Sequence, residues 1–234
     1  MKIRALLFGK NFLSFTFMLL TVVFLVKGIG LILTPYLLSL PAWLSFVLGY
    51  SLQTLVFGIV LYFWFVRRFP TERKSIVFAS PGIGKLFQYV IFIFISYFLF
   101  SAAVFAISEQ LGFSKVIGFE EQPSLLDPIR GHSVGVMALF FIALFAAPII
   151  EEYVFRGWGM ICLPTEKYPM LAIFLNGLLF ALLHGQPASI IPLIFLGCMI
   201  AWARIHSGSL LPGIIFHVIN NSLAFLVDYW FPHL

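Results

Sequence analysis

Charge is what this sequence has least of. Only 10% of its 234 residues are Asp, Glu, Lys or Arg, and just nine are acidic. A typical soluble domain carries about 25% charged and roughly 45–50% apolar residues, whereas 62% of this chain is hydrophobic. A soluble fold of this length has too small an interior to hide so much apolar surface. The composition excludes an ordinary soluble domain and predicts an integral membrane protein.

Cysteine is nearly absent too. Cys162 and Cys198 lie far apart, each in an apolar segment, and their spacing matches neither a zinc-binding pair nor a redox motif. We interpret both as small buried hydrophobic residues. The sequence also has no strand-type alternation, internal repeat or low-complexity tract, so no β fold or repeat architecture competes with a helical one.

Long apolar runs dominate the rest of the chain. A helix needs about 20 apolar residues to cross a bilayer, and Pro and Gly occur in most breaks between the runs. The predicted fold is all-α, a polytopic transmembrane helix bundle of about seven spans. The first run lacks a small-residue cleavage site, so we expect a retained span rather than a signal peptide. The expected spans are 12–33, 42–66, 86–108, 135–162, 169–185, 189–205 and 210–230.

The basic residues flank the predicted spans. Loops rich in Lys and Arg stay cytoplasmic, which predicts a cytoplasmic N-terminus and a cytoplasmic second loop. Because the positive charge borders the membrane, the expected partner is the lipid bilayer and not a nucleic acid. The basic residues before the first span and after the second are Lys2, Arg4, Lys10, Arg67, Arg68, Arg73, Lys74 and Lys85.

Polar groups inside the spans are unevenly distributed along the chain. The first three spans carry almost no chemically active side chains, and the last four carry nearly all of them. We therefore predict two parts. Residues 1–133 hold the N-terminal membrane spans 1–3 and an outer loop, and residues 134–230 form a helical core that carries the candidate functional residues.

The stretch AAPIIEEYVFRGW places three charges in one apolar run. A charge at mid-bilayer costs about 2.5–3.5 kcal/mol on insertion scales, so each needs compensation. Glu152 and Arg156 are four residues apart, with the acid first, which is the favourable order for an ion pair on one helical face. Such a pair can be purely structural. Glu151 points about 100° away around the helix and needs a different partner.

Three further polar residues end or follow apolar runs. His184 lies one turn after Phe180, and His217 and Asn221 lie one turn apart on one helical face. Each has a structural explanation, as a helix cap or as a hydrogen bond between helices. Side chains lean toward the N-terminus of their own helix, so those of antiparallel neighbours lean together. We expect Glu151 to face His184.

These residues fall into three ordered motifs. EEYVFR matches EExxxR, FALLH matches FxxxH, and HVINN matches HxxxN. Together they resemble the CPBP family of intramembrane proteases, also called the ABI or CAAX-protease family, which includes Rce1-like enzymes. The segment MIAWARIHSGSLLPGIIFHVINN resembles the final helical hairpin of that family. The resemblance covers about residues 135–225 and does not extend to the first three spans.

The resemblance implies an endopeptidase site within the membrane. It makes Glu151 the general base that activates water, with His184 assisting, and His217 and Asn221 the groups that stabilise the oxyanion. Peptide hydrolysis needs such a base and such donors. No Ser or Cys accompanies a base in these motifs, so a covalent nucleophile is not indicated. The supporting residues are Glu152, Arg156 and Phe180.

A catalytic metal is an open alternative. Glu151, His184 and His217 form a plausible Zn²⁺ ligand set, and zinc would lower the pKa of a bound water to about 7. The HExxH helix motif is absent, however, and a metal-free glutamate mechanism fits the same residues. The cofactor is therefore either Zn²⁺ or none.

We expect an intramembrane endopeptidase that hydrolyses a membrane-associated peptide, with a prenylated CAAX-type substrate as the resemblance suggests. One alternative is an ion- or proton-coupled transporter, which would use the same intramembrane polar residues but usually has paired halves with interrupted helices. Another is a non-catalytic membrane scaffold or immunity protein in which the polar residues serve helix packing.

Overall fold

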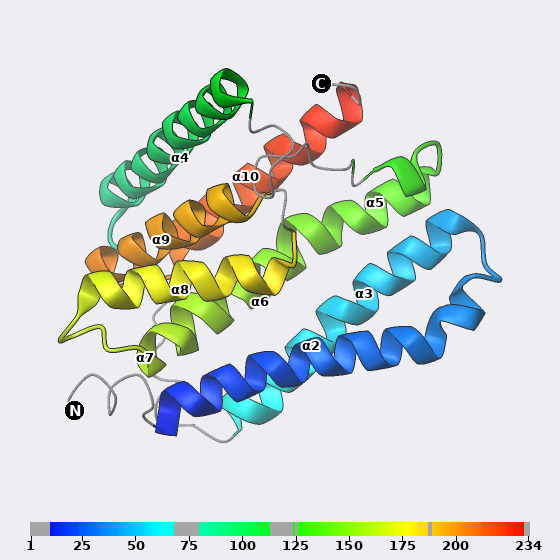
Figure 1. The fold of residues 1–234 in the computed structure, drawn as a ribbon, viewed down its shortest axis with the longest axis horizontal. Coiled ribbons are helices and arrows are strands. Elements are labelled where there is room, and N and C mark those ends of the chain that lie inside the picture. The colour runs from blue at the N-terminus through cyan, green and yellow to red at the C-terminus, as the bar shows by residue number, and fades with distance from the viewer. Residues whose placement is uncertain (1–9, 68–79, 113–123, 125, 187–188, 232–234) are drawn as a thin grey trace. The chain divides into compact units, whose positions relative to one another are not determined.

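The structure is a computed structural model that describes residues 10–67, 80–112, 124, 126–186 and 189–231 (Figure 1). In these ranges every regular element is a helix, as predicted. Lys2, Arg4, Arg68, Arg73 and Lys74 lie outside the described residues, and the cytoplasmic N-terminus stays a prediction. The elements are α2 Lys10–Leu37, α3 Ala42–Leu61, η1 Tyr62–Val66, α4 Ile83–Leu111, η3 Asp127–Ile129, α5 Ser133–Phe141, η4 Ile142–Ala146, α6 Ala147–Glu152, η5 Tyr153–Gly159, α7 Met160–Cys162, α8 Pro169–His184, α9 Ile190–Ser207 and α10 Leu211–Trp230.

Six helices of the described chain are long and apolar enough to cross a membrane. The seventh apolar helix, α8, has 16 residues and measures about 24 Å at 1.5 Å per residue, against about 30 Å of hydrocarbon. The predicted total of about seven spans is consistent with this set. The chain is an integral, multi-pass membrane protein.

The predicted end of the first span differs most from the structure. The first break was expected from Thr34, but α2 continues through Pro35 to Leu37. A proline so close to a helix end removes a single backbone donor. The Thr34 hydroxyl also donates to the Gly30 carbonyl at 2.8 Å, which adds a local bond across this last turn.

The described helices form two compact units that interleave along the sequence, and each unit is described by itself. The first unit comprises 1–15, 74–123 and 152–216, and the second comprises 16–73, 124–151 and 217–234. The predicted division at residue 133 concerns function and stays a prediction.

The first unit is built on close packing of α8 against α9, which run side by side (Figure 1). A Cβ added at Gly197 would lie 2.7 Å from the Gly177 Cα, and one at Gly177 would lie 2.6 Å from the Cys198 Sγ. Small residues let membrane helices approach this closely. Two apolar clusters complete the unit, one around Ile93, Leu196, Ile200, Ala203 and Phe216 and one around Met160, Leu163, Ala172, Ile173 and Ala201.

The second unit has its core where α3 meets α5, η3 and η4. Its buried residues are Val47, Leu126, Ile129, Leu139, Ala143, Leu144 and Phe225. Phe225 comes from the second half of α10, so this core holds α10 against α5. The rings of Phe140 and Phe225 meet edge to face, 5.6 Å apart.

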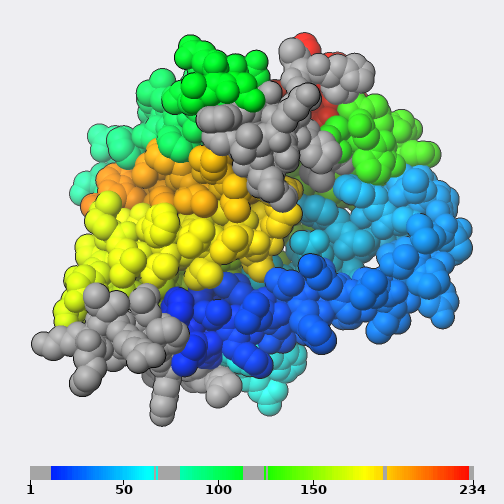
Figure 2. All heavy atoms as spheres, in the orientation of Figure 1, coloured from blue at the N-terminus to red at the C-terminus, as the bar shows by residue number. Residues whose placement is uncertain are grey.

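Large apolar side chains also cover the outside of the helices, as lipid contact requires. Part of α8 is in view in yellow in Figure 2. Its side chains Met170, Phe174 and Leu182 are exposed. The exposed surface of the other long helices has the same character. This distribution is that of a bundle in lipid, since soluble monomers rarely expose large contiguous apolar patches.

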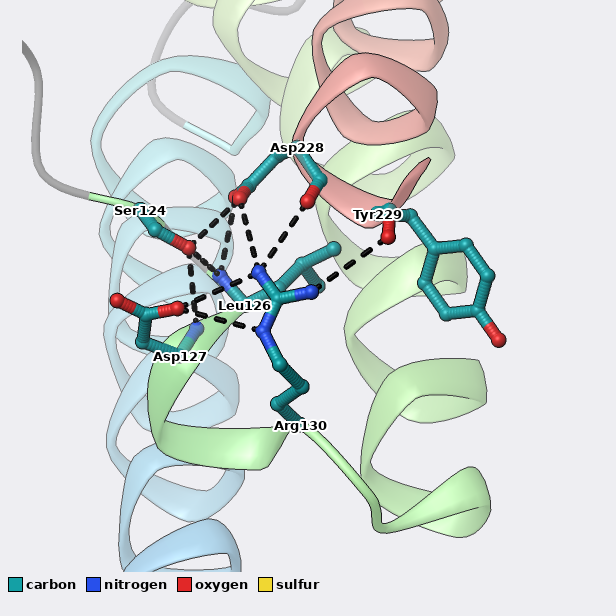
Figure 3. Close-up of polar contacts among 6 residues, drawn as sticks. All are labelled: Ser124, Leu126, Asp127, Arg130, Asp228 and Tyr229. Atoms are coloured by element: carbon teal, nitrogen blue, oxygen red, sulfur yellow. Dashed lines mark hydrogen bonds and ion pairs between the residues drawn. The ribbon is translucent and has the colours of Figure 1, made fainter. Parts of the chain in front are cut away.

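A polar cluster fastens the C-terminal end of α10 in the second unit (Figure 3). Asp228 accepts hydrogen bonds from the Ser124 hydroxyl at 2.6 Å and the Leu126 amide at 3.2 Å. Arg130 forms ion pairs of 3.3 Å with both Asp127 and Asp228 and donates to the Asp228 carbonyl at 3.2 Å. We call these four side chains, Ser124, Asp127, Arg130 and Asp228, the α10 clasp. It satisfies carbonyls that a helix end leaves without partners.

Candidate active site

The two acids of the EEYVFR motif lie on a short α-helix between two π-helical segments. α6 spans Ala147–Glu152, with η4 (Ile142–Ala146) before it and η5 (Tyr153–Gly159) after it. In a π-helix each amide bonds to the carbonyl five residues back, and such segments are rare and frequently mark functional sites. Apolar periodicity does not reveal them, and the sequence alone predicted one continuous helix here.

Glu152 and Arg156 form the predicted ion pair within the first unit. Arg156 Nη1 donates to Glu152 Oε1 at 3.1 Å, and neither side chain has any exposed surface. Arg156 Nη2 donates to the Gly197 carbonyl of α9 at 3.1 Å. The guanidinium also lies 4.4 Å from the centroid of the Phe180 ring. A fully buried charge needs partners on several sides, and here α6, α8 and α9 each provide one.

Further groups hold this buried pair from outside. The Nε of Arg204 donates to the carbonyl of Arg156 at 3.2 Å, and the Asn176 amide donates to that of Phe155 at 2.7 Å. Both carbonyls belong to η5. A Cβ at Gly213 would lie 2.7 Å from Glu152 Oε2, so the first turn of α10 packs directly on the carboxylate.

His184 ends α8, also in the first unit. Its Nδ1 lies 2.8 Å from the Phe180 carbonyl, and the two rings are 4.4 Å apart. Because a carbonyl only accepts hydrogen bonds, Nδ1 carries the proton in this contact. In the neutral ring Nε2 is then the basic nitrogen. The FxxxH spacing therefore sets the tautomer of the histidine.

In the second unit, Glu151 lies close to His217. His217 Nε2 lies 3.7 Å from Glu151 Oε2, and their side chains are 5% and 19% exposed. This distance is longer than a direct hydrogen bond. The two side chains form an ion pair when the imidazole is protonated. The carboxylate is thus largely, but not completely, removed from solvent.

Asn221 lies one turn beyond His217 on α10 and bonds to η4. Its side-chain amide donates to the Ala143 carbonyl at 3.0 Å. An amide nitrogen has two hydrogens, so this contact uses one and fixes the direction of the other. This contact is a hydrogen bond between helices. Such a bond is the structural explanation that the sequence suggested for His217 and Asn221.

Three polar residues around these groups were missed from the sequence. Tyr50 of α3 lies within electrostatic range of Glu151, and Asn176 and Arg204 bond to η5 as described. None of the three stands at a motif spacing. Asn176 could have been found, because it is an uncharged polar residue within an apolar run. Tyr50 and Arg204 give no such signal, since tyrosine is common in a span and arginine at the end of one.

The residues of the predicted zinc set are divided between the two units. Of Glu151, His184 and His217, only Glu151 and His217 meet within one unit. No group of three or more His, Cys, Asp or Glu side chains in the described chain is arranged to hold a metal ion. The zinc alternative stays a prediction, and we derive no step through a metal.

The structure thus brings the predicted residues together in two sets. Glu152, Arg156, Phe180 and His184 belong to the first unit, and Glu151, His217 and Asn221 to the second. The expected pairing of Glu151 with His184 involves both units and stays a prediction.

The helices of this polytopic membrane protein carry a buried carboxylate–guanidinium pair and a carboxylate–imidazole pair. Residues 133–223 match the family model described as type II CAAX prenyl endopeptidase Rce1-like. Over this segment the chain is similar to the Rce1-like group of the CPBP family, as the three motifs predicted. The match covers less than half of the chain and excludes the first three spans. No curated protein and no solved structure matches the chain.

Proposed function

We propose that the chain is an intramembrane endopeptidase in which Glu151 activates water. The observation that carries the proposal is the 3.7 Å approach of Glu151 to His217 in surroundings that leave the two side chains only 19% and 5% exposed. Both residues lie in the segment that matches the family model. A carboxylate kept mostly from water, with a titratable partner, is the kind of group that serves as a general base.

In the proposed reaction a water molecule attacks the scissile carbonyl carbon while Glu151 takes one of its protons. The carbonyl electron pair moves onto oxygen and gives a tetrahedral oxyanion. Collapse of this intermediate breaks the C–N bond, and the proton held by Glu151 passes to the leaving amine. The hydroxyl group of the water stays on the new carboxyl group and its other proton goes to the new amine, so no further reactant is needed.

His217 and Asn221 are the proposed oxyanion donors. One Asn221 hydrogen is directed at the Ala143 carbonyl, which leaves the second for a developing negative charge. Fixed donors of this kind act through preorganisation, since they need no rearrangement when charge develops. His184 has the tautomer of a neutral base or donor, and its role beside Glu151 is carried over from the resemblance.

Glu152, Arg156 and Phe180 are proposed as supporting residues. Their contacts join α6, α8 and α9, so they fix η5 and the chain that directly follows Glu151 in the sequence. A base displaced by about 1 Å loses much of its effect, so a rigid anchor next to Glu151 serves catalysis without contact to substrate.

The proposed substrate is a peptide attached to the membrane, with a prenylated CAAX-type C-terminal segment as the first candidate. Support comes from the description of the matched family and from a site carried on membrane helices. A lipid anchor would also place the scissile bond at the bilayer, where a soluble peptide is scarce.

The test is cleavage of quenched peptides by the purified full-length chain. We expect a farnesylated CAAX peptide to be cut faster than the same peptide without the lipid, and Glu151→Ala and His184→Ala to lose this activity. Glu109→Ala removes an exposed carboxylate of α4 and is the matched control. A chelator added to the same assay, with metal analysis of the protein, examines the zinc alternative.

Three results would contradict the proposal. A folded wild-type protein that is inert toward a broad peptide panel favours the scaffold alternative, and proton-coupled uptake in proteoliposomes favours the transporter. Cleavage by Glu151→Ala at the wild-type rate would remove Glu151 from the reaction.

A further inference from the structure

A cavity of about 740 Å³ in the first unit has no role in the proposed reaction. It lies between the turn after α7 and the last turn of α9, and its lining includes Leu163, Glu166, Lys167, Arg204 and Ile205. The candidate spans end at Cys162 and Ser207, so the cavity opens at a boundary between hydrocarbon and water. Its volume is within the range of small-molecule sites, about 300–1,000 Å³.

The cavity has a fixed cation on its wall. Arg204 is half-buried, and its Nε donates to the carbonyl of Arg156 at 3.2 Å. This bond uses one edge of the planar guanidinium and leaves the terminal nitrogens for another acceptor. In the described part of the chain no carboxylate forms an ion pair with Arg204.

The other two charges of the lining lie on the exposed turn. Lys167 adds a second positive charge and Glu166 a negative one, which leaves the cavity with a net charge of about +1. Exposed charges are well screened by water and salt, so the half-buried Arg204 dominates the field inside. Leu163 and Ile205 give the same cavity an apolar wall.

We propose that this cavity binds the phosphate headgroup of an anionic phospholipid, with Arg204 and Lys167 on the phosphate and the apolar wall on the glycerol and upper acyl chain. Arginine binds phosphate oxygens through two parallel hydrogen bonds. Basic pockets at the membrane surface attract anionic lipids, and a phospholipid presents phosphate and hydrocarbon at the depth where the spans end.

A bound headgroup would act on the buried ion pair as well. Arg204 is one hydrogen bond away from Arg156, which holds Glu152 and the Gly197 carbonyl. A ligand that fixes Arg204 therefore stabilises η5 and, through linkage, the folded protein. The inference does not depend on peptidase activity.

The test uses the delipidated full-length protein in detergent, titrated with dioleoylphosphatidylglycerol or dioleoylphosphatidylcholine and followed by native mass spectrometry and thermal unfolding. We expect the anionic lipid to bind more tightly and to raise the melting temperature. Arg204→Gln and Lys167→Gln should each weaken binding of the anionic lipid about fivefold. Glu166→Gln should strengthen that binding. Lys85→Gln, the same change at an exposed lysine outside the cavity, should behave as wild type.

Equal affinity of the wild type for the two lipids would overturn the proposal, as would an unchanged preference in the Arg204→Gln, Lys167→Gln double variant. A short peptide with a free C-terminal carboxylate, compared with its amide, tests the competing ligand class. If Arg204→Gln and Lys167→Gln weaken only the binding of the free-acid peptide, the cavity recognises a peptide carboxylate and the lipid proposal fails.

Discussion

Glu151 and Glu152 are neighbours in the sequence with different surroundings. Glu152 is fully buried against Arg156, whereas Glu151 keeps 19% of its side-chain surface and lies near a histidine. The first arrangement suits a structural ion pair, and the second suits the base of the proposed reaction. The two carboxylates are therefore expected to respond differently to substitution.

Glu152→Ala should mainly destabilise the protein. It leaves the Arg156 charge buried with its carboxylate partner removed, a change that costs about 3–5 kcal/mol in comparable sites. Thermal unfolding in detergent measures this effect. Glu152→Gln keeps an acceptor for Arg156 and should lower the free energy of unfolding by less. Equal melting temperatures for wild type and Glu152→Ala would contradict the structural role of Glu152.

Asn221→Ala should lower both activity and stability, to different extents. Loss of an oxyanion donor reduces kcat by about 10²–10³-fold, whereas loss of the hydrogen bond to the Ala143 carbonyl costs about 1 kcal/mol. Steady-state kinetics and thermal unfolding of the same sample separate the two effects. A stability loss with full activity would leave Asn221 with only its packing role.

At the scale of elements, α9 and α10 pack closely around the buried ion pair of Glu152 and Arg156. A Cβ at Gly213 would lie 2.5 Å from the Ile200 Cγ2 and 2.7 Å from the Glu152 Oε2. Gly213→Ala should therefore push the start of α10 from α9 and cost about 1–3 kcal/mol. The control is Gly30→Ala in α2, where a Cβ meets nothing within 4 Å, and which should be neutral or stabilising. Unfolding measurements compare the two, and similar melting temperatures would refute this tight packing.

The α10 clasp should contribute little to stability. Arg130 is 35% exposed and Asp228 19%, and ion pairs at such exposure contribute about 0–1 kcal/mol. Arg130→Gln should lower the melting temperature slightly at low salt and less at high salt, because salt screens exposed charges. A large loss that is independent of salt would show that the clasp is needed to form α10.

For the whole molecule, the sequence predicted the helical class, the approximate positions of the long helices and the ion pair of Glu152 with Arg156. These follow from local rules, namely span length, turn residues and a four-residue spacing. It did not predict the approach of Glu151 to His217 or of Asn221 to Ala143, because such contacts depend on how distant helices pack. The π-helical segments around α6 were missed because one extra residue per turn leaves no mark on an apolar run.

The most direct test of Glu151 as the base is single-turnover cleavage of a farnesylated CAAX peptide by Glu151→Gln, beside Glu109→Gln and wild type. Gln has the size of Glu but cannot take up the proton, so the rate should fall by about 10²–10⁴-fold with an unchanged melting temperature, while Glu109→Gln cleaves normally. A Glu151→Gln protein that is folded and cleaves at the wild-type rate would contradict the proposed mechanism.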